Sequence, residues 1–405
     1  MRFSRSSSAL GRLLGAGMVC LAGLSLGCHA PGTESTTVPP VATGASCTAL
    51  AATCAANQQG CIEEADGGAS CQPCGPGTYA STAGACETIP GTPMTHVFPD
   101  QTTTAGQEIL GFCRSWTLDN AEDFWVNSVE LVQDEYSHHS NWVYVPDTDY
   151  AGPDGIWECA SRSYDFYTGV GDGGLLYSQS TQATHEVQRF GDGAATHVPA
   201  HVRIISDIHL LNTSSSSNTG HATLTVYTIP AAEVTAKLVA FHVEYDALTI
   251  PPLATSRFTG TCPVASAVVK TQGSAFAPKV HYLLPHTHTL ATGFYADILG
   301  GPNDGQSMIN LGTYNGEAHG RGFDPPIDMT GALGITLSCQ YTNPRTTEVG
   351  WGFGTSEMCE LFGFADTPDF FQAAVPTGMA AGTDADGVQL FTSTACNVDV
   401  IPAPM

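Results

Sequence analysis

Two stretches of the chain, 201-HVRIISDIHLLN-212 and 222-ATLTVYTI-229, indicate its fold class. Both are short and apolar at strand length, and both are rich in β-branched residues. Similar runs recur from about residue 91 onward, and Gly-, Asn- and Pro-containing turns separate them. No segment keeps the 3.6-residue apolar period of an amphipathic helix for long. We therefore predict an all-β protein with two tandem antiparallel β-sandwich domains, jelly-roll-like, over residues 91–232 and 233–401.

The chain is sparsely charged and strongly acidic. Only 13% of its 405 residues are charged, 44 are glycine, and the formal net charge is -25. A surface this acidic repels phosphate groups, so the composition argues against nucleic acid or anionic lipid as a partner.

The first 27 residues read as an export signal. Three arginines precede an apolar run over residues 13–26, which is too short for an ordinary spanning helix. Gly27-Cys28 resembles a bacterial lipobox, although Ser25 stands where an aliphatic residue is usual. We expect a lipid anchor at Cys28 on a bacterial membrane, facing the periplasm or the exterior, and simple secretion is the alternative. Residues 28–46 predict a flexible tether, because they offer little to bury.

Residues 47–90 form a cysteine-rich segment too short to build a core of its own. Its six cysteines are Cys47, Cys54, Cys61, Cys71, Cys74 and Cys86. The Cys71–Cys74 spacing also fits a zinc half-site or a redox pair. Because the segment lacks histidine and the chain is exported, we expect three structural disulfides, in a pairing that the sequence leaves open.

Three histidines stand close together in 281-HYLLPHTHTL-290. Side chains alternate between the faces of a strand, so His286 and His288 point the same way and can bind one metal ion. The His138-His139 pair could do so only at a bend or bulge, because neighbouring side chains on a regular strand diverge. Taken singly, each motif also fits ordinary half-buried or exposed histidines, and so does His209.

Met358 lies in 354-GTSEMCEL-361, between a glutamate and a cysteine rather than in an apolar stripe. Methionine usually fills gaps in a core. A thioether joined to two imidazoles, however, makes a soft site that suits copper better than zinc or magnesium.

In this order, and with the cysteines around them, the motifs of residues 91–400 resemble the copper type II, ascorbate-dependent monooxygenases. This is the family of peptidylglycine α-hydroxylating monooxygenase and dopamine β-hydroxylase. The resemblance implies two copper ions per chain and a small organic substrate. It also implies O2 and an electron donor such as ascorbate, with hydroxylation of a substrate C–H bond.

The resemblance also implies the ligands. One copper would be held in the first sandwich by His138, His139 and His209. The catalytic copper would be held in the second by His286, His288 and Met358, and the two sites would face each other across a cleft. The implied disulfides are Cys113–Cys159, Cys262–Cys396 and Cys339–Cys359. The remaining histidines are expected to have no ligand role: His185, His197, His201, His221, His242, His281 and His319.

The chain departs from the peptide-amidating members of that family at their substrate anchor. Leu284 stands where those members have an arginine, and Glu360 follows Cys359 where they have an asparagine. We therefore expect no peptide carboxylate as substrate. Glu360 would favour an amine, unless it is a solvated surface residue.

Two further functions belong to other classes. A cell-surface binding protein could use the same double sandwich without copper. A copper carrier or storage protein would need the ligands but no oxygen chemistry.

Overall fold

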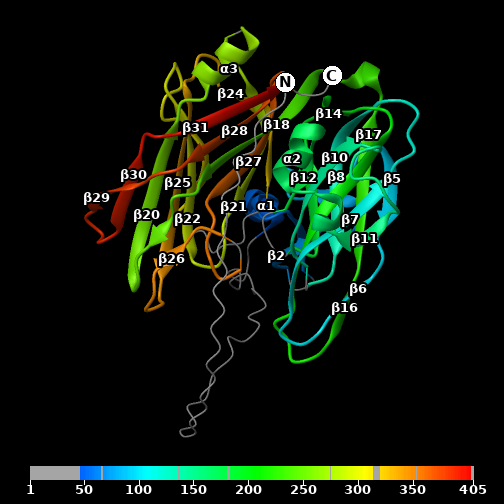
Figure 1. The fold of residues 1–405 in the computed structure, drawn as a ribbon, viewed down its shortest axis with the longest axis horizontal. Helices are drawn as coiled ribbons and strands as arrows, with labels where there is room; N and C mark the ends of the chain where they lie inside the picture. Colours follow the sequence, from blue (N-terminus) through cyan, green and yellow to red (C-terminus); the bar gives the residue numbers. More distant parts are fainter. Residues whose placement is uncertain are drawn as a thin grey trace, which may run out of the picture. The chain divides into compact units, whose positions relative to one another are not determined.

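The structure, a computed structural model, describes residues 46–64, 67–135, 137–179, 183–273, 275–312, 320–352 and 354–402. The predicted export signal, Cys28, nearly all of the tether and His319 lie outside these residues. Strands dominate the described part, and after a disulfide-rich N-terminal segment they form large, mainly antiparallel sheets (Figure 1). The predicted all-β, double jelly-roll-like fold is confirmed.

The cysteine-rich segment is one helix and two small hairpins. Its elements are α1 (Cys47–Ala56), β1 (Gln59–Glu63), β2 (Ala69–Pro73), β3 (Thr78–Ala80) and β4 (Cys86–Thr88). Three disulfides staple it: Cys47–Cys61, Cys54–Cys71 and Cys74–Cys86. It lies against the first half of the protein, where the Arg189 guanidinium is 4.6 Å from the Tyr79 ring centre. The His185 ring nitrogen Nδ1 is 2.7 Å from the Cys74 carbonyl oxygen.

The first half follows from residue 92. Its elements are β5 (Thr92–Val97), β6 (Gln101–Thr103), β7 (Glu108–Thr117), β8 (Phe124–Gln133), β9 (Ser137–His139), β10 (Asn141–Pro146), β11 (Gly155–Glu158), a 3-10 turn (Cys159–Arg162), α2 (Phe166–Asp172), β12 (Gly174–Ser178), β13 (His185–Arg189), β14 (Ala194–Val198), β15 (Val202–Leu211), β16 (Asn218–Gly220) and β17 (Ala222–Ile229). One sheet runs β11-β7-β15-β10-β12, with β9 on β15, and it packs on β14, β8, β17 and β5. Trp142 and Tyr144 of β10 point into the core between these layers.

The second half begins after a 3-10 turn (Ala231–Glu233). Its elements are β18 (Ala236–Tyr245), β19 (Thr249–Ile250), β20 (Ala254–Cys262), α3 (Ala265–Gln272), β21 (Lys279–His286), β22 (Ala291–Leu299), β23 (Ser307–Leu311), β24 (Arg321–Asp328), β25 (Gly334–Asn343), β26 (Val349–Gly350), β27 (Glu360–Asp366), β28 (Asp369–Val375), β29 (Met379–Thr383), β30 (Gln389–Ser393) and β31 (Asn397–Pro402). One sheet runs β23-β22-β25-β20-β30-β29, and the facing layer contains β24, β21, β27 and β18. Phe241, Leu283 and Leu361 point into the core between them.

The two halves share one continuous sheet. β14 of the first half pairs in parallel with β18 of the second, through Ala194–Ala236, Ala195–Lys237 and Thr196–Leu238. This pairing joins the order β24-β21-β27-β18-β14-β8-β17-β5 into a single eleven-stranded sheet with its side strands. The turn at Ala231–Glu233 lies near the predicted boundary at residue 232, and the domain ranges stay predictions.

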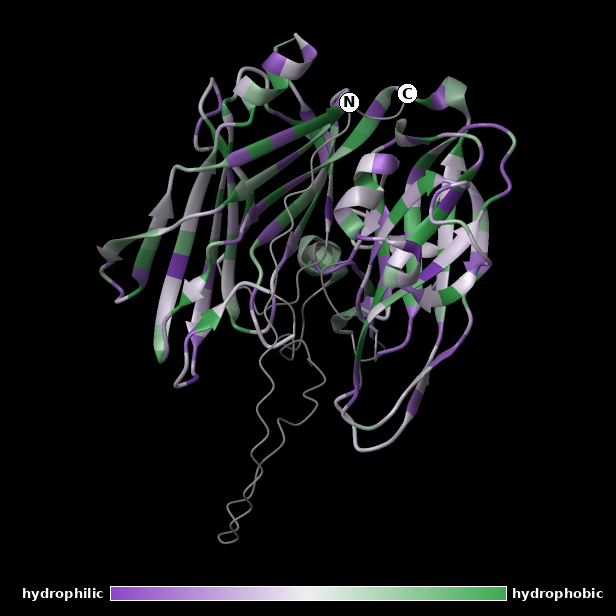
Figure 2. Cartoon of the chain, viewed as in Figure 1, coloured by the Kyte–Doolittle hydropathy of each residue, from purple (hydrophilic) through white to green (hydrophobic). Residues whose placement is uncertain are grey.

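A shared hydrophobic core also joins the halves. Alternation along β10 turns Val143 and Val145 away from the first core, and they belong to one cluster with Leu284 and Phe362 of the second half. Hydrophobic residues lie on strands of both halves, as Figure 2 shows. The face of β18, β21 and β27 that points away from the second half's own core therefore meets the first half.

Candidate metal centre

His139 and His209 lie opposite each other on neighbouring strands. His139 ends β9, His209 lies in β15, and the pairing shifts register between His209 and Leu210. Such an irregularity is what the His138-His139 pair needs if both histidines are to bind one ion. The two rings are 4.9 Å apart, and His139 Nε2 lies 3.2 Å from His209 Nδ1.

His286 and His288 are placed differently from the prediction. β21 ends at His286, so His288 lies on the following loop rather than on the strand. The carboxylate of Glu357 holds this loop, accepting hydrogen bonds from the backbone N–H of His288 (2.9 Å) and of Leu290 (2.7 Å). The two imidazole rings still meet, with centres 5.3 Å apart.

All four imidazoles belong to one group, which we call the imidazole cluster: His139, His209, His286 and His288. The His139 ring lies 4.9 Å from that of His286 and 6.3 Å from that of His288. Donor atoms of His139, His286 and His288 lie within 4.8 Å of one another, and the four side chains are only 3–7% exposed. The prediction of two separate sites across a cleft is therefore wrong, because the shared sheet and core bring both halves' histidines together.

The spacing suits a metal ion. Nitrogen ligands lie about 2.0–2.1 Å from a bound zinc or similar ion, which puts two of them about 3.3 Å apart in a tetrahedron. The observed 3.2 Å between His139 Nε2 and His209 Nδ1 matches that spacing. The cluster could therefore hold a metal ion, and its geometry does not identify the metal.

Two outer contacts orient the rings. His209 Nε2 lies 2.8 Å from Glu108 Oε1, and His288 Nδ1 lies 2.8 Å from the Ser356 carbonyl oxygen. Both partners accept, so each of these nitrogens carries the proton, and the other nitrogen of each ring keeps its lone pair. Bonds of this kind fix the tautomer of metal-binding histidines. Sequence reasoning missed Glu108, Ser356 and Glu357, because no local pattern connects them to the histidines.

Burial keeps the imidazoles in the form that binds metal. It lowers the pKa of His209, against the opposing effect of Glu108, and it also lowers the pKa of His288. Both are therefore neutral near pH 7. Burial also raises the pKa of Glu357 to about 7, although the backbone bonds from Leu290 and His288 act in the other direction.

The other two predicted ligands are only partly placed. Met358 is buried, and its backbone lies between Glu357, which holds the His288 loop, and Cys359. Its carbonyl oxygen accepts a hydrogen bond from the Tyr341 hydroxyl (2.5 Å). His138 belongs to β9, and its side chain lies outside the described residues. The roles of Met358 and His138 as ligands stay predictions.

The disulfides of the two halves join Cys113 to Cys159, Cys262 to Cys396 and Cys339 to Cys359. These are the pairs that the resemblance implied. With the three in the cysteine-rich segment, they indicate an oxidising compartment outside the cytoplasm. Among the described residues, no helix has the length and apolar character needed to cross a membrane.

A second group of ligand-type side chains lies beside the first, and we call it the carboxylate cluster: His242, Glu244 and Glu360. Their donor atoms lie within 4.8 Å of one another, and the residues are 2–6% exposed. His242 was expected to have no ligand role, yet it belongs to a group that could hold a metal ion. Glu360 is not a solvated surface residue. The sequence signal for this group is the His242-x-Glu244 spacing on β18, which puts both side chains on one face of the strand.

The two clusters meet at a row of paired residues. Glu360 is the direct partner of His286 on one side and of Glu244 on the other. Directly opposed residues point to the same face of a sheet. Burial opposes ionisation of Glu360, but the neighbouring His242 side chain, with smaller contributions from His286 and His288, outweighs it and lowers the pKa. Burial raises the pKa of Glu244.

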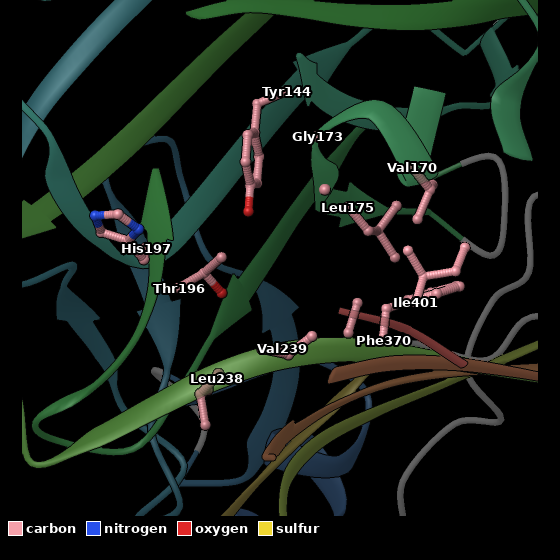
Figure 3. Close-up of a pocket in the computed structure, with 12 residues that line it drawn as sticks. Tyr144, Val170, Gly173, Leu175, Thr196, His197, Leu238, Val239, Phe370 and Ile401 are labelled. Carbon is pink, nitrogen blue, oxygen red and sulfur yellow. The ribbon is translucent and has the colours of Figure 1, made fainter. Parts of the chain in front are cut away.

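A small pocket elsewhere has a different character. Figure 3 shows it between the end of α2 and strands β14, β18 and β28, with Val170, Leu175 and Leu238 on its wall. Its lining is mostly apolar and includes no member of either cluster. It is therefore not part of the candidate centre.

No family model matches the chain, and no curated protein matches its sequence. Two viral capsid proteins are among the solved structures to which it is similar. The major capsid protein P2 from bacteriophage PM2 matches with a TM-score of 0.32 at 8% identity, over 68% of this chain and 97% of that one. VP54 of PBCV-1, fitted into a reconstruction of the virophage Sputnik, matches with a TM-score of 0.24 at 7% identity, over 69% and 94%.

The predicted membership of the copper type II monooxygenase family is therefore wrong. The chain matches no family model, that of the monooxygenases included. The motifs behind that prediction are only one to three residues long.

Proposed function

We propose that the protein is an exported copper-dependent monooxygenase. It would hydroxylate a C–H bond of a small organic substrate with O2 and a reductant such as ascorbate. One oxygen atom enters the C–H bond, and the other leaves as water with two electrons and two protons from the reductant. The proposal covers chemistry only and implies no family relationship.

The observation that carries this proposal is the convergence of histidines from both halves of the chain. His139 and His209 come from the first half, His286 and His288 from the second, and the rings of His139 and His286 are 4.9 Å apart. Neutral imidazoles suit copper and zinc, and a thioether such as that of Met358 favours reduced copper.

The number of donors supports more than one copper. The predicted set contains five imidazoles and one thioether, whereas a tetrahedral ion takes four ligands. We therefore propose two copper ions side by side at the imidazole cluster rather than in distant sites. Copper bound there would supply O2 binding and one-electron transfer.

The chain's own residues would hold and shield this centre. Glu108 and the Ser356 carbonyl orient two of the rings, and Glu357 fixes the loop that carries His288. Burial keeps bulk water away, which strengthens electrostatic interactions within the site.

We also propose that Cys28 carries a lipid that anchors the protein to a membrane.

Copper content and oxygen consumption together test this function. The copper-loaded protein should consume O2 with ascorbate only when a hydroxylatable substrate is present, and the product should carry one atom from labelled O2. A panel of phenethyl, amine and peptide compounds serves as the substrate screen. Copper binding without turnover on any of them would contradict the proposal.

A substitution at Met358 tests the thioether. Met358→Leu nearly conserves volume, so the fold should be retained within about 1.5 kcal/mol. We expect the hydroxylation rate to fall by about 100-fold or more while two coppers stay bound, because histidines supply the other ligands. Urea unfolding checks the fold, and Met379→Leu, at an exposed methionine, is the matched control. Full activity of Met358→Leu would show that the Met358 thioether is not a ligand of the catalytic copper.

The near-complete burial of the four imidazoles favours a second candidate function. An exported copper-binding protein without catalysis needs only the ligands and no access for an organic substrate. In that case the copper-loaded protein would pass its metal to a chelator or an apoprotein, and would take up no O2 with any substrate of the panel.

A further inference from the structure

We propose that the carboxylate cluster is a separate binding site for a divalent transition-metal ion. One nitrogen of His242 and one carboxylate oxygen each of Glu244 and Glu360 would be its ligands. The site is distinct from the imidazole cluster, and it does not depend on the proposed copper chemistry.

Two carboxylates lie together in the carboxylate cluster. Glu244 and Glu360 are direct partners on the neighbouring strands β18 and β27, and both are 6% exposed. Like charges placed opposite each other in a sheet are destabilising, and buried carboxylates need a compensating partner. A divalent cation between them would balance both charges.

The buried His242 ring has no hydrogen-bond partner among the described residues. The ring is 2% exposed, and neither of its nitrogens makes a hydrogen bond with any described residue. Nε2 lies 3.6 Å from Glu360 Oε2, which is too far for a hydrogen bond but places the nitrogen beside the carboxylates. Buried polar groups normally have a partner, so an imidazole in this position calls for one.

The three donor atoms of the carboxylate cluster are close together. The three donor atoms lie within 4.8 Å of one another. Ligands on opposite sides of one ion, at metal–ligand distances of about 2.0–2.2 Å, are at most about 4.4 Å apart. The donors therefore lie near the spacing that a single bound ion requires.

Neighbouring side chains orient the carboxylate cluster and leave it a route to solvent. The Phe362 ring stacks on His242 at 4.4 Å, and Gln372 Nε2 donates to Glu244 Oε1 at 3.2 Å, so both ligands have fixed orientations. Tyr167 of α2 lies over the cluster, 6.1 Å from the His242 ring, and is 43% exposed. An ion would enter from solvent on the Tyr167 side.

The donor types indicate the kind of metal. Carboxylates suit manganese and other hard ions, whereas imidazole suits zinc, iron and nickel. A set of two carboxylates and one imidazole takes ions that accept both. Mn²⁺ is a suitable probe, because its paramagnetic resonance changes on binding and because it has little preference for the nitrogen-only ligands next to it.

The test uses the full chain, stripped of metal and titrated with Mn²⁺ alone. Resonance spectra and equilibrium dialysis should show one tightly bound Mn²⁺ per chain. Glu244→Gln should weaken Mn²⁺ binding by about 100-fold or more, because even the loss of an outer contact lowers metal affinity by about 10–100-fold. The same variant should bind copper at the imidazole cluster as the wild type does.

Two further variants complete the design. His139→Ala should lose copper and keep Mn²⁺, whereas Glu186→Gln, at a fully buried glutamate outside both clusters, should keep both metals. His242→Gln provides a second ligand variant if Glu244→Gln does not fold. Absence of Mn²⁺ binding to the wild type, or unchanged binding to a folded ligand variant, would overturn the site whatever the result with copper.

Discussion

The imidazole cluster and the carboxylate cluster are neighbours built in different ways. The first draws its four histidines from both halves, on β9, β15, β21 and the loop after β21. The second draws its three side chains from the neighbouring strands β18 and β27 of one sheet. The first therefore depends on how the halves meet, whereas the second needs only the local register.

Their outer contacts differ in the same way. Glu108, Ser356 and Glu357 lie far along the chain from the histidines that they hold. The carboxylate cluster has Phe362 and Gln372, which belong to strands paired with β18. A metal centre at a junction needs partners from several segments, and a centre within a sheet can take them from the next strand. Variants that affect one cluster and spare the other test this difference.

The largest expected effect is that of His139→Ala. His139 contacts the other three rings, so its removal should lower affinity for both coppers, by about 100-fold or more. Two separate sites would instead keep one copper. Metal analysis after dialysis decides between these outcomes. The control is His197→Ala, which removes a histidine that contacts Asp123 and should leave copper binding unchanged.

Removing the disulfide Cys339–Cys359 should have the next largest effect. It closes a loop of 20 residues, so its loss should lower the free energy of unfolding by about 3 kcal/mol. Because Cys359 lies between Met358 and Glu360, the double alanine variant should also weaken both metal sites. Urea unfolding and metal titration measure the two effects. The matched variant lacking Cys47–Cys61 should keep both sites, and unchanged metal binding in the first variant would contradict this coupling.

Glu108→Gln should affect only the imidazole cluster. The carboxylate contacts His209 Nε2, and loss of such an outer partner lowers metal affinity by about 10–100-fold. Copper titration should show that loss while Mn²⁺ binding is retained. Glu122→Gln, at an exposed glutamate, is the control. An equal loss of both metals would mean that the clusters act as one unit.

The smallest effect concerns a buried carboxyl group outside both clusters. Burial raises the pKa of Glu186 to about 7, so the folded protein holds this proton more tightly than the unfolded chain does. The stabilisation is therefore complete below the unfolded pKa of about 4.5 and is lost as the pH rises toward 7. We expect the wild type to lose about 1–2 kcal/mol more than Glu186→Gln between pH 5 and pH 7 in urea unfolding. Equal losses would contradict the assignment.

The β fold was predictable because its signal is local. Runs such as NWVYVP place alternate residues on opposite faces, and in the structure Trp142 and Tyr144 enter one core while Val143 and Val145 enter another. The continuous sheet was not predictable in this way. The parallel β14–β18 pairing depends on how the chain turns at Ala231–Glu233, and no side-chain pattern records it.

The candidate site was predictable in part, for a similar reason. Spacing identifies His286 and His288 as a pair, whereas the family resemblance assigns His139 to another ion in a separate sandwich. The sequence prediction gives His242 no ligand role, although Glu244, two residues further along β18, lies on the same face of the strand. Glu360 joins them only through strand pairing, which is long-range information.

The parallel pairing of β14 and β18 has a consequence for the integrity of the molecule. A protease that cut the exposed turn at Ala231–Glu233 would leave two fragments still hydrogen-bonded edge to edge and still sharing a buried interior. Nicked protein would therefore elute with the intact chain on a sizing column and come apart only in denaturant.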